Sequence, residues 1–139
     1  MSHEHIGVCV IVINDQNQLL LGKRKNGYRA GYYGLPGGQL ELKEKLEDAI
    51  KRELYEETGL KGNSVSCLGV VRELQETYNY IHFCFTCQEF EGEPTLCEPE
   101  KCEGWEWYPI DALPSPLLPG HQAALSLCSN HTSSVIDLI

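Results

Sequence analysis

The sequence is poor in basic residues and has no long hydrophobic run. Its 139 residues include 11 Lys and Arg against 20 Asp and Glu, a formal net charge of −9. Nucleic-acid polymers are therefore excluded as partners, because no basic stripe exists to neutralise their phosphates. No apolar stretch approaches the roughly 20 residues of a membrane helix, and the N-terminus has no signal-peptide pattern. We expect a cytoplasmic protein without membrane partners.

The chain also lacks the cysteine pattern of a disulfide-stabilised protein, because it holds seven cysteines, an odd number. Two close pairs, Cys84 with Cys87 and Cys97 with Cys102, raise the alternative of a zinc site. However, Cys84 and Cys87 fall in an apolar run that predicts a strand, where residues i and i+3 point to opposite faces. We therefore predict buried free thiols.

Glycine and proline are absent from Lys45 to Thr58, and Gly59 follows directly. A glycine at this position is typical of a left-handed helix end, so the stretch is predicted to be a helix. At about 100° per residue, one apolar stripe of this helix consists of Leu46, Ala49, Ile50 and Leu54.

Carboxylates share the core-facing side of this predicted helix. Glu53 and Glu57 project along the apolar stripe, and Glu56 lies on its flank. Buried carboxylates are costly without compensation, and the i, i+3, i+4 spacing brings these three close together. Oxygen ligands favour Mg²⁺, with Mn²⁺ as a substitute. The alternative, a solvated helix with an Arg52–Glu56 pair, does not explain why the carboxylates lie on the buried side.

The length and the apolar pattern predict one α/β domain over residues 1–139. Two strands, Ile6–Ile13 and Gln18–Lys25, are predicted to form a hairpin around the turn 14–17. A loop follows at Asn26–Gly34, and the tail Ser129–Ile139 has no assignment. The other predicted elements are the strands Val65–Glu76, Tyr78–Phe90 and Gly104–Pro109, with Trp105 and Trp107 in the core, and a weak helix Leu117–Cys128.

The most specific pattern is the 23-residue run from Gly38 to Leu60. It reads Gly38-x5-Glu44-x7-Arg52-Glu53-Leu54-x-Glu56-Glu57-x-Gly59-Leu60. With no position missing, the run resembles a complete Nudix box. This resemblance implies a Nudix fold, a mixed β-sheet sandwiched between α-helices, in a hydrolase that cuts nucleoside diphosphates linked to another group.

The same resemblance implies roles for the residues of the box. Glu53, Glu56 and Glu57 would hold the metal and, with Arg52, would form the catalytic set. Arg52 would orient one glutamate of the helix through a charge-assisted hydrogen bond. Glu44 would support the site from behind the metal ligands.

Glycines precede the box in the run Leu35-Pro36-Gly37-Gly38, from which Leu35, Gly37 and Gly38 are candidate substrate contacts. Both glycines allow close backbone approach, so the Gly37 carbonyl is a candidate metal ligand, although an ordinary turn explains them equally well. Glu100 and Glu103 lie in the loop that faces the box in this fold. Glu100 is our candidate for completing the metal set, against the alternative of a solvated acidic loop.

Two flanking segments, 19–25 and 98–107, together with the box resemble nucleoside-triphosphate diphosphatases of the 8-oxo-dGTPase and dCTP-pyrophosphatase type. This implies metal-dependent hydrolysis of a (deoxy)nucleoside triphosphate to the monophosphate and pyrophosphate, a role in nucleotide-pool sanitation, and a homodimer. Arg24 would contact the nucleotide and His82 the base. The alternatives are that Arg24 is a solvated charge at a strand end and that His82 has a structural role.

Departures from the pattern leave the preferred base open. Gly34 replaces a polar residue, Lys43 replaces a glycine, and segment 116–120 lacks an aromatic, so we expect a more open or differently shaped base pocket. An ADP-ribose pyrophosphatase is an alternative, although its characteristic proline after the box is missing between Pro36 and Pro94. Tyr78 keeps a dinucleoside-polyphosphate enzyme open. A non-catalytic nucleotide sensor is disfavoured because every box glutamate is present.

Overall fold

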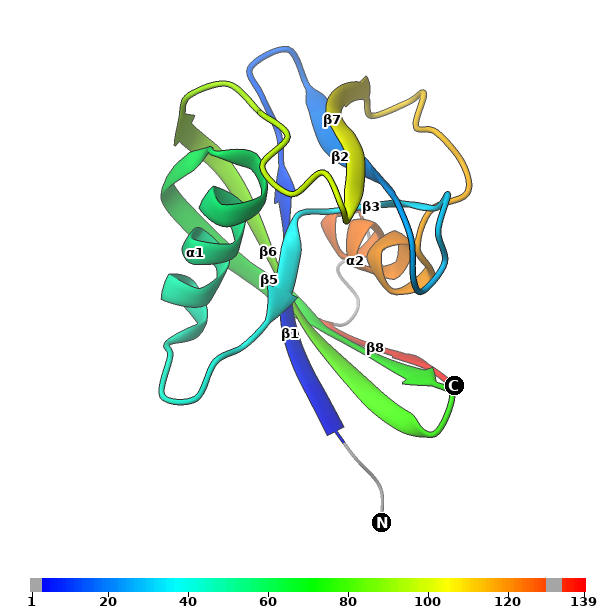
Figure 1. Ribbon diagram of the computed structural model, residues 1–139. Helices are drawn as coiled ribbons and strands as arrows, with labels where there is room; N and C mark the ends of the chain where they lie inside the picture. Colours follow the sequence, from blue (N-terminus) through cyan, green and yellow to red (C-terminus); the bar gives the residue numbers. More distant parts are fainter. Residues whose placement is uncertain (1–3, 130–133) are drawn as a thin grey trace.

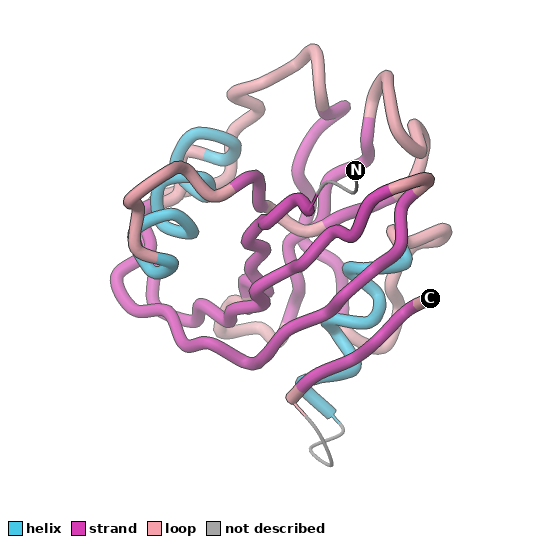
Figure 2. The backbone as a smooth tube through the Cα atoms, turned by 90° about the horizontal axis from the view of Figure 1, so that it is seen from below, coloured by secondary structure: helices cyan, strands magenta, loops and turns pink. Residues whose placement is uncertain are grey.

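The computed structural model describes residues 4–129 and 134–139. Figure 1 shows α1 and α2 on opposite sides of the strands β1, β5 and β6, and Figure 2 shows the same strands running between the two helices. The predicted α/β architecture is therefore confirmed. The described elements are β1 (Glu4–Val12), β2 (Gln18–Arg24), β3 (Tyr33–Gly34), β4 (Gly37–Gln39), α1 (Leu46–Thr58), β5 (Lys61–Gln75), β6 (Tyr78–Glu91), β7 (Cys102–Pro109), α2 (Pro119–Ser129) and β8 (Val135–Leu138).

The strands form two sheets. A five-stranded mixed sheet has the order β4-β1-β6-β5-β8, in which β1 runs parallel to β6 and β5 parallel to β8, and a three-stranded antiparallel sheet has the order β3-β2-β7. The predicted hairpin of the first two strands is wrong. Beyond the turn they share only an isolated bridge between Ile13 and Leu19, because β4 and β6 already occupy both edges of β1.

The C-terminal tail supplies a strand that the sequence pattern did not predict. Its residues Val135–Leu138 form β8, which pairs in parallel with β5 from Val70 to Glu73. Residues 130–133 of the tail lie outside the described part. Two short strands near the start of the box were likewise not predicted. β3 lies at the end of the segment predicted as a loop, and β4 lies just after that segment.

The helices bury the residues that their periodicity selects. α1 buries Ala49, Ile50 and Leu54 against the even-numbered residues of β1, as predicted, and it ends at Gly59 in the left-handed conformation with φ 78°. α2 covers the opposite face, where Ala124 packs in a second core cluster with residues of β1 and β5. It begins at Pro119, two residues later than predicted, because proline suits the first helical turn.

All seven cysteines are free thiols. Cys84 and Cys87 are buried in different core clusters, which confirms that they point to opposite faces of β6. The prediction of buried thiols is wrong for Cys97, which is exposed. Across the described ranges, the helices are too short or too polar to cross a membrane.

Candidate active site

A cavity of about 350 Å³ lies between the Nudix-box segment, the three-stranded sheet and the first turn of α2. Its wall includes all five residues that the sequence assigned to substrate contact: Arg24, Leu35, Gly37, Gly38 and His82. It also includes residues that the sequence analysis did not select, among them Tyr80, Glu98, Lys101, Leu118 and His121. The cavity therefore joins the end of α1 to the strands β1 and β6 and to the beginning of α2.

Arg52 donates hydrogen bonds to three carboxylates of the box. It donates two hydrogen bonds to Glu44, at 2.6 and 3.0 Å, and one each to Glu53 at 2.7 Å and Glu56 at 3.1 Å. The hydrogen bond from Arg52 lowers the pKa of Glu44. For Glu53, burial outweighs Arg52 and raises the pKa of its carboxyl. The geometry matches the orienting role predicted for Arg52 and the supporting role predicted for Glu44.

Glu57 points away from Arg52 and towards the backbone of the glycine loop. Its Oε1 accepts a 2.8 Å hydrogen bond from the Gly37 amide, and the Trp105 indole donates to the Glu57 carbonyl at 3.1 Å. Burial raises the pKa of Glu57 to about 8, and the negative charges of Glu53 and Glu98 add to this effect. One amide donor does not compensate the buried carboxylate, which leaves a place for a cation.

The predicted ligands share a surface without meeting at one point. Among the residues that the structure describes, no three His, Cys, Asp or Glu side chains converge closely enough to hold a metal ion. Arg52 hydrogen-bonds Glu53 and Glu56 on one side, while the Gly37 amide holds Glu57 on the other.

The chemistry of the donors nevertheless fits a hard divalent ion. All three are carboxylates, and Glu57 is partly buried with only one amide donor on its carboxyl group. Gly38 leaves space for the Glu53 carboxylate, because a Cβ at this position would overlap it.

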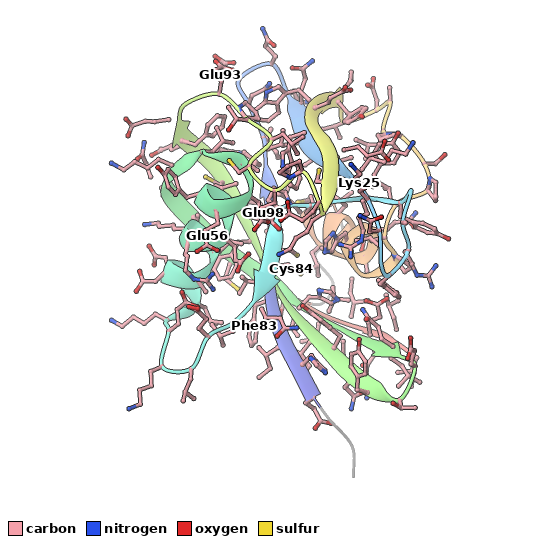
Figure 3. All side chains as sticks on the ribbon, in the orientation of Figure 1. Lys25, Glu56, Phe83, Cys84, Glu93 and Glu98 are labelled. Atoms are coloured by element: carbon pink, nitrogen blue, oxygen red, sulfur yellow. The ribbon has the colours of Figure 1, made fainter. Side chains whose placement is uncertain are left out.

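The acidic loop places a different glutamate at the cavity from the one predicted. Glu100 is exposed and does not line the cavity, while its carbonyl accepts a hydrogen bond from Asn26 at 3.0 Å. Oε2 of Glu103 lies 4.0 Å from Nζ of Lys23. Glu98 lines the cavity, raises the pKa of both Glu53 and Glu57, and faces α1 in Figure 3. The sequence identified the loop, but spacing in an irregular segment does not say which carboxylate turns inward.

Of the two expectations for the base pocket, more open or differently shaped, the structure does not support a more open wall at Gly34. A Cβ at Gly34 would lie 2.8 Å from Leu118 and 3.0 Å from His121 Nδ1, so side chains from the start of α2 occupy the space. His121 also accepts a 2.8 Å hydrogen bond from the Leu35 amide. Nothing in the sequence linked His121 to this site, because the contact joins residues that are 86 positions apart.

The NUDIX domain family matches residues 3–128 of the chain. The oxidized purine nucleoside triphosphate hydrolase of Mus musculus is 31% identical over 121 residues, which covers 82% of this chain and 72% of that protein. An ADP-ribose pyrophosphatase of Methanocaldococcus jannaschii is 48% identical, but over only 42% of this chain and 35% of that protein. The crystal structure of a MutT NUDIX hydrolase from Burkholderia pseudomallei superposes with a TM-score of 0.86 at 31% identity, covering 91% of this chain and 98% of that one.

The chain therefore belongs to the NUDIX family, and it is a hydrolase that acts on nucleotide phosphoanhydride bonds. Members of this family generally use divalent metal ions. The Nudix fold and the recognition of the box, both inferred from the sequence, are confirmed.

Proposed function

We propose that this protein hydrolyses a (deoxy)nucleoside triphosphate, with a normal or modified base, to the monophosphate and pyrophosphate. The observation that carries the proposal is one cavity that joins a carboxylate wall, with Glu57 and Glu98, to a group of cations, with Arg24, Lys25 and Lys101. A triphosphate needs both, because its oxygens bind metal ions and basic side chains alike. The relatives named for oxidised purine triphosphates support the same substrate class.

Glu53, Glu56 and Glu57 are the residues that would hold Mg²⁺, for which Mn²⁺ can substitute, and the Gly37 carbonyl is a further candidate ligand. Glu98 replaces Glu100 as the carboxylate that the loop contributes. The ion supplies Lewis-acid stabilisation of the charge that develops on the phosphate oxygens. Arg52 positions Glu53 and Glu56, and Glu44 holds Arg52 in place.

In the proposed reaction, a water oxygen forms a bond to the α-phosphorus, and the bond from that phosphorus to the bridging oxygen breaks. Pyrophosphate leaves with the bond's electron pair, and a cavity carboxylate accepts the proton of the water. Lys101 lies at the cavity with its Nζ 3.6 Å from Glu98, where it can bind the leaving phosphates. Cleavage between the α- and β-phosphates follows the reaction of the enzymes that the chain resembles.

The test is hydrolysis with Mg²⁺ of canonical deoxynucleoside triphosphates, 8-oxo-dGTP, ADP-ribose and diadenosine polyphosphates. It is read as pyrophosphate release for the triphosphates and as nucleotide products separated by chromatography for the other two classes. We expect release from at least one triphosphate, and a loss of at least 100-fold in kcat/KM for Glu57→Gln. Glu47→Gln is the matched control. It removes one charge from the same helix, at a side chain that is 61% exposed and pairs only with Lys51 at 3.2 Å.

Activity on ADP-ribose or dinucleotides alone would overturn the substrate class and leave the metal-site proposal standing. Full activity of Glu57→Gln would overturn the metal site itself. Folding of each variant is checked by circular dichroism, so a loss of activity is assigned to chemistry only in folded protein.

A further inference from the structure

A buried polar network lies at the end of the cavity away from the box. Oε1 of Glu73 is 3.0 Å from His82 Nε2 and accepts a 3.0 Å hydrogen bond from the Gln75 amide, which in turn accepts from Tyr78. Glu73 and His82 are 6% and 7% exposed. Neither belongs to the Nudix box, so the metal chemistry leaves this network unexplained.

Glu73 is ionised. Burial alone would raise its pKa, but the hydrogen bonds from His82 and Gln75 outweigh burial and lower it. Both bonds go to Oε1, and Oε2 has no partner within the described residues. No buried side-chain oxygen or nitrogen there lacks a partner, so Oε2 keeps some accessible surface, and Glu73 lines the adjoining space.

That space is a pocket of about 20 Å³ at the back of the main cavity, with Glu73, Gly120 and His121 in its wall. The volume is close to what one water molecule needs, so one small group of a ligand fits. Gly120 keeps the pocket in this form, because a Cβ there would lie 2.6 Å from Glu73 Oε1 and 2.7 Å from His82 Nε2.

His121 supplies a donor beside this acceptor. Its Nδ1 accepts the 2.8 Å hydrogen bond from the Leu35 amide, so the proton of the neutral ring is on Nε2. Burial, together with the charges of His82 and Arg24, lowers the pKa of His121 to about 3, which keeps the ring neutral. Within the described residues Nε2 has no partner, and it is therefore open to the cavity.

We propose that Glu73 and His121 are specificity-determining residues that select nucleotides whose base carries an exocyclic amino group beside a ring-nitrogen acceptor. The amino group enters the small pocket and donates to Glu73 Oε2, and the ring nitrogen accepts from His121 Nε2–H. Cytosine and adenine present this edge. This inference rests on the proposed function, and it names the class of base that the same site accepts.

We expect the deaminated bases, uracil and hypoxanthine, to bind poorly at Glu73 and His121. Uracil and hypoxanthine place a carbonyl oxygen where the amino group was, and an ionised carboxylate repels it because it has no proton to donate. A site with buried hydrogen-bonding groups rejects an analogue that leaves them unpaired far more strongly than an apolar pocket does.

The experiment compares kcat/KM for two matched pairs, dCTP with dUTP and dATP with dITP, by pyrophosphate release from the wild-type protein with Mg²⁺. We expect the amino-bearing member to exceed its partner at least tenfold in at least one pair. Equal values in both pairs, or a preference for the deaminated member, would overturn the inference. Pyrophosphate release would still support the proposed function, whereas no release from any triphosphate would overturn both.

Two variants locate the preference. Glu73→Gln presents an amide that can donate as well as accept, so the ratio within the pair should fall towards one, mainly through KM. His121→Asn keeps an acceptor for the Leu35 amide and removes the Nε2 donor, and it should also lower the ratio. Glu76→Gln, at an exposed turn residue next to β5, is the matched control and should keep the wild-type ratio. A wild-type ratio in folded Glu73→Gln and His121→Asn would overturn the assignment.

Discussion

His121 should make the stability of this protein fall in mildly acidic solution. Its pKa is lowered to about 3 in the folded protein by burial and by the charges of His82 and Arg24. An unperturbed imidazole has a pKa of about 6.5. Between these two values the unfolded chain binds a proton that the folded protein does not, so stability decreases as the pH falls from 6.5 towards 3.

The size of the effect follows from the same two values. A pH of 5 lies about 1.5 units below the pKa of the imidazole in the unfolded chain, so that imidazole is protonated, while the ring in the folded protein remains neutral. This difference removes about 2 kcal/mol of stability relative to pH 7.5. The free energy of unfolding of a small domain is typically about 5–15 kcal/mol, so this loss is a large part of it.

The measurement is urea unfolding at pH 7.5 and pH 5 for the wild type and for His121→Asn. The asparagine cannot titrate, and its side-chain oxygen can still accept from the Leu35 amide. The wild type should lose about 2 kcal/mol more than the variant between the two pH values. Groups that titrate in both proteins and do not interact with His121 cancel in this difference. An equal pH dependence in the two proteins would refute the reasoning, because it would mean that His121 titrates in the fold as it does in the unfolded chain.

Three further outcomes are expected. Lys43→Gly should stabilise the fold by about 1 kcal/mol, measured as a higher Tm, because Lys43 has φ 67°, where a side chain is strained. An unchanged or lower Tm would mean that the lysine side chain compensates its backbone. Gly38→Ala should lower kcat/KM at least tenfold, since the added Cβ displaces the Glu53 carboxylate; near-normal pyrophosphate release would contradict this. Thiol labelling of the native protein, read by mass spectrometry, should modify Cys67 and Cys97 first, as the exposed cysteines, and faster labelling of buried thiols would show an opening of the core.

The sequence predicts α1 well because every local signal there agrees. The apolar spacing, the absence of glycine and proline, and the stop at Gly59 all describe one helix, and Ala49, Ile50 and Leu54 are buried as expected. The same periodicity places Glu53 and Glu57 towards the interior. It does not show that Arg52 separates Glu53 from Glu57, since this depends on which carboxylates the guanidinium reaches.

The long-range features are those that the sequence does not reveal. Strand β8 is four residues long and finds its partner in β5, and β2 leaves β1 because other strands occupy both edges of β1. Pairings of this kind are decided by competition between distant segments, which no local pattern records. The contact of His121 with Leu35 is of the same type, and for this reason the sequence does not reveal that His121 lines the cavity.

The charge of the cavity explains why the carboxylates and the cations have to act together. A triphosphate that approaches a protein of net charge −9 meets the carboxyl groups of Glu57 and Glu98 on one wall of the cavity. Arg24, Lys25 and Lys101 line the same cavity and supply the positive charge that partly offsets this wall. Under the proposed function, substrate affinity depends on neutralisation of the carboxylate wall by divalent ions, whereas discrimination between bases falls to Glu73 and His121 at the other end of the cavity. The two ends of the cavity can consequently vary independently, which allows one Nudix box to serve nucleotides with different bases.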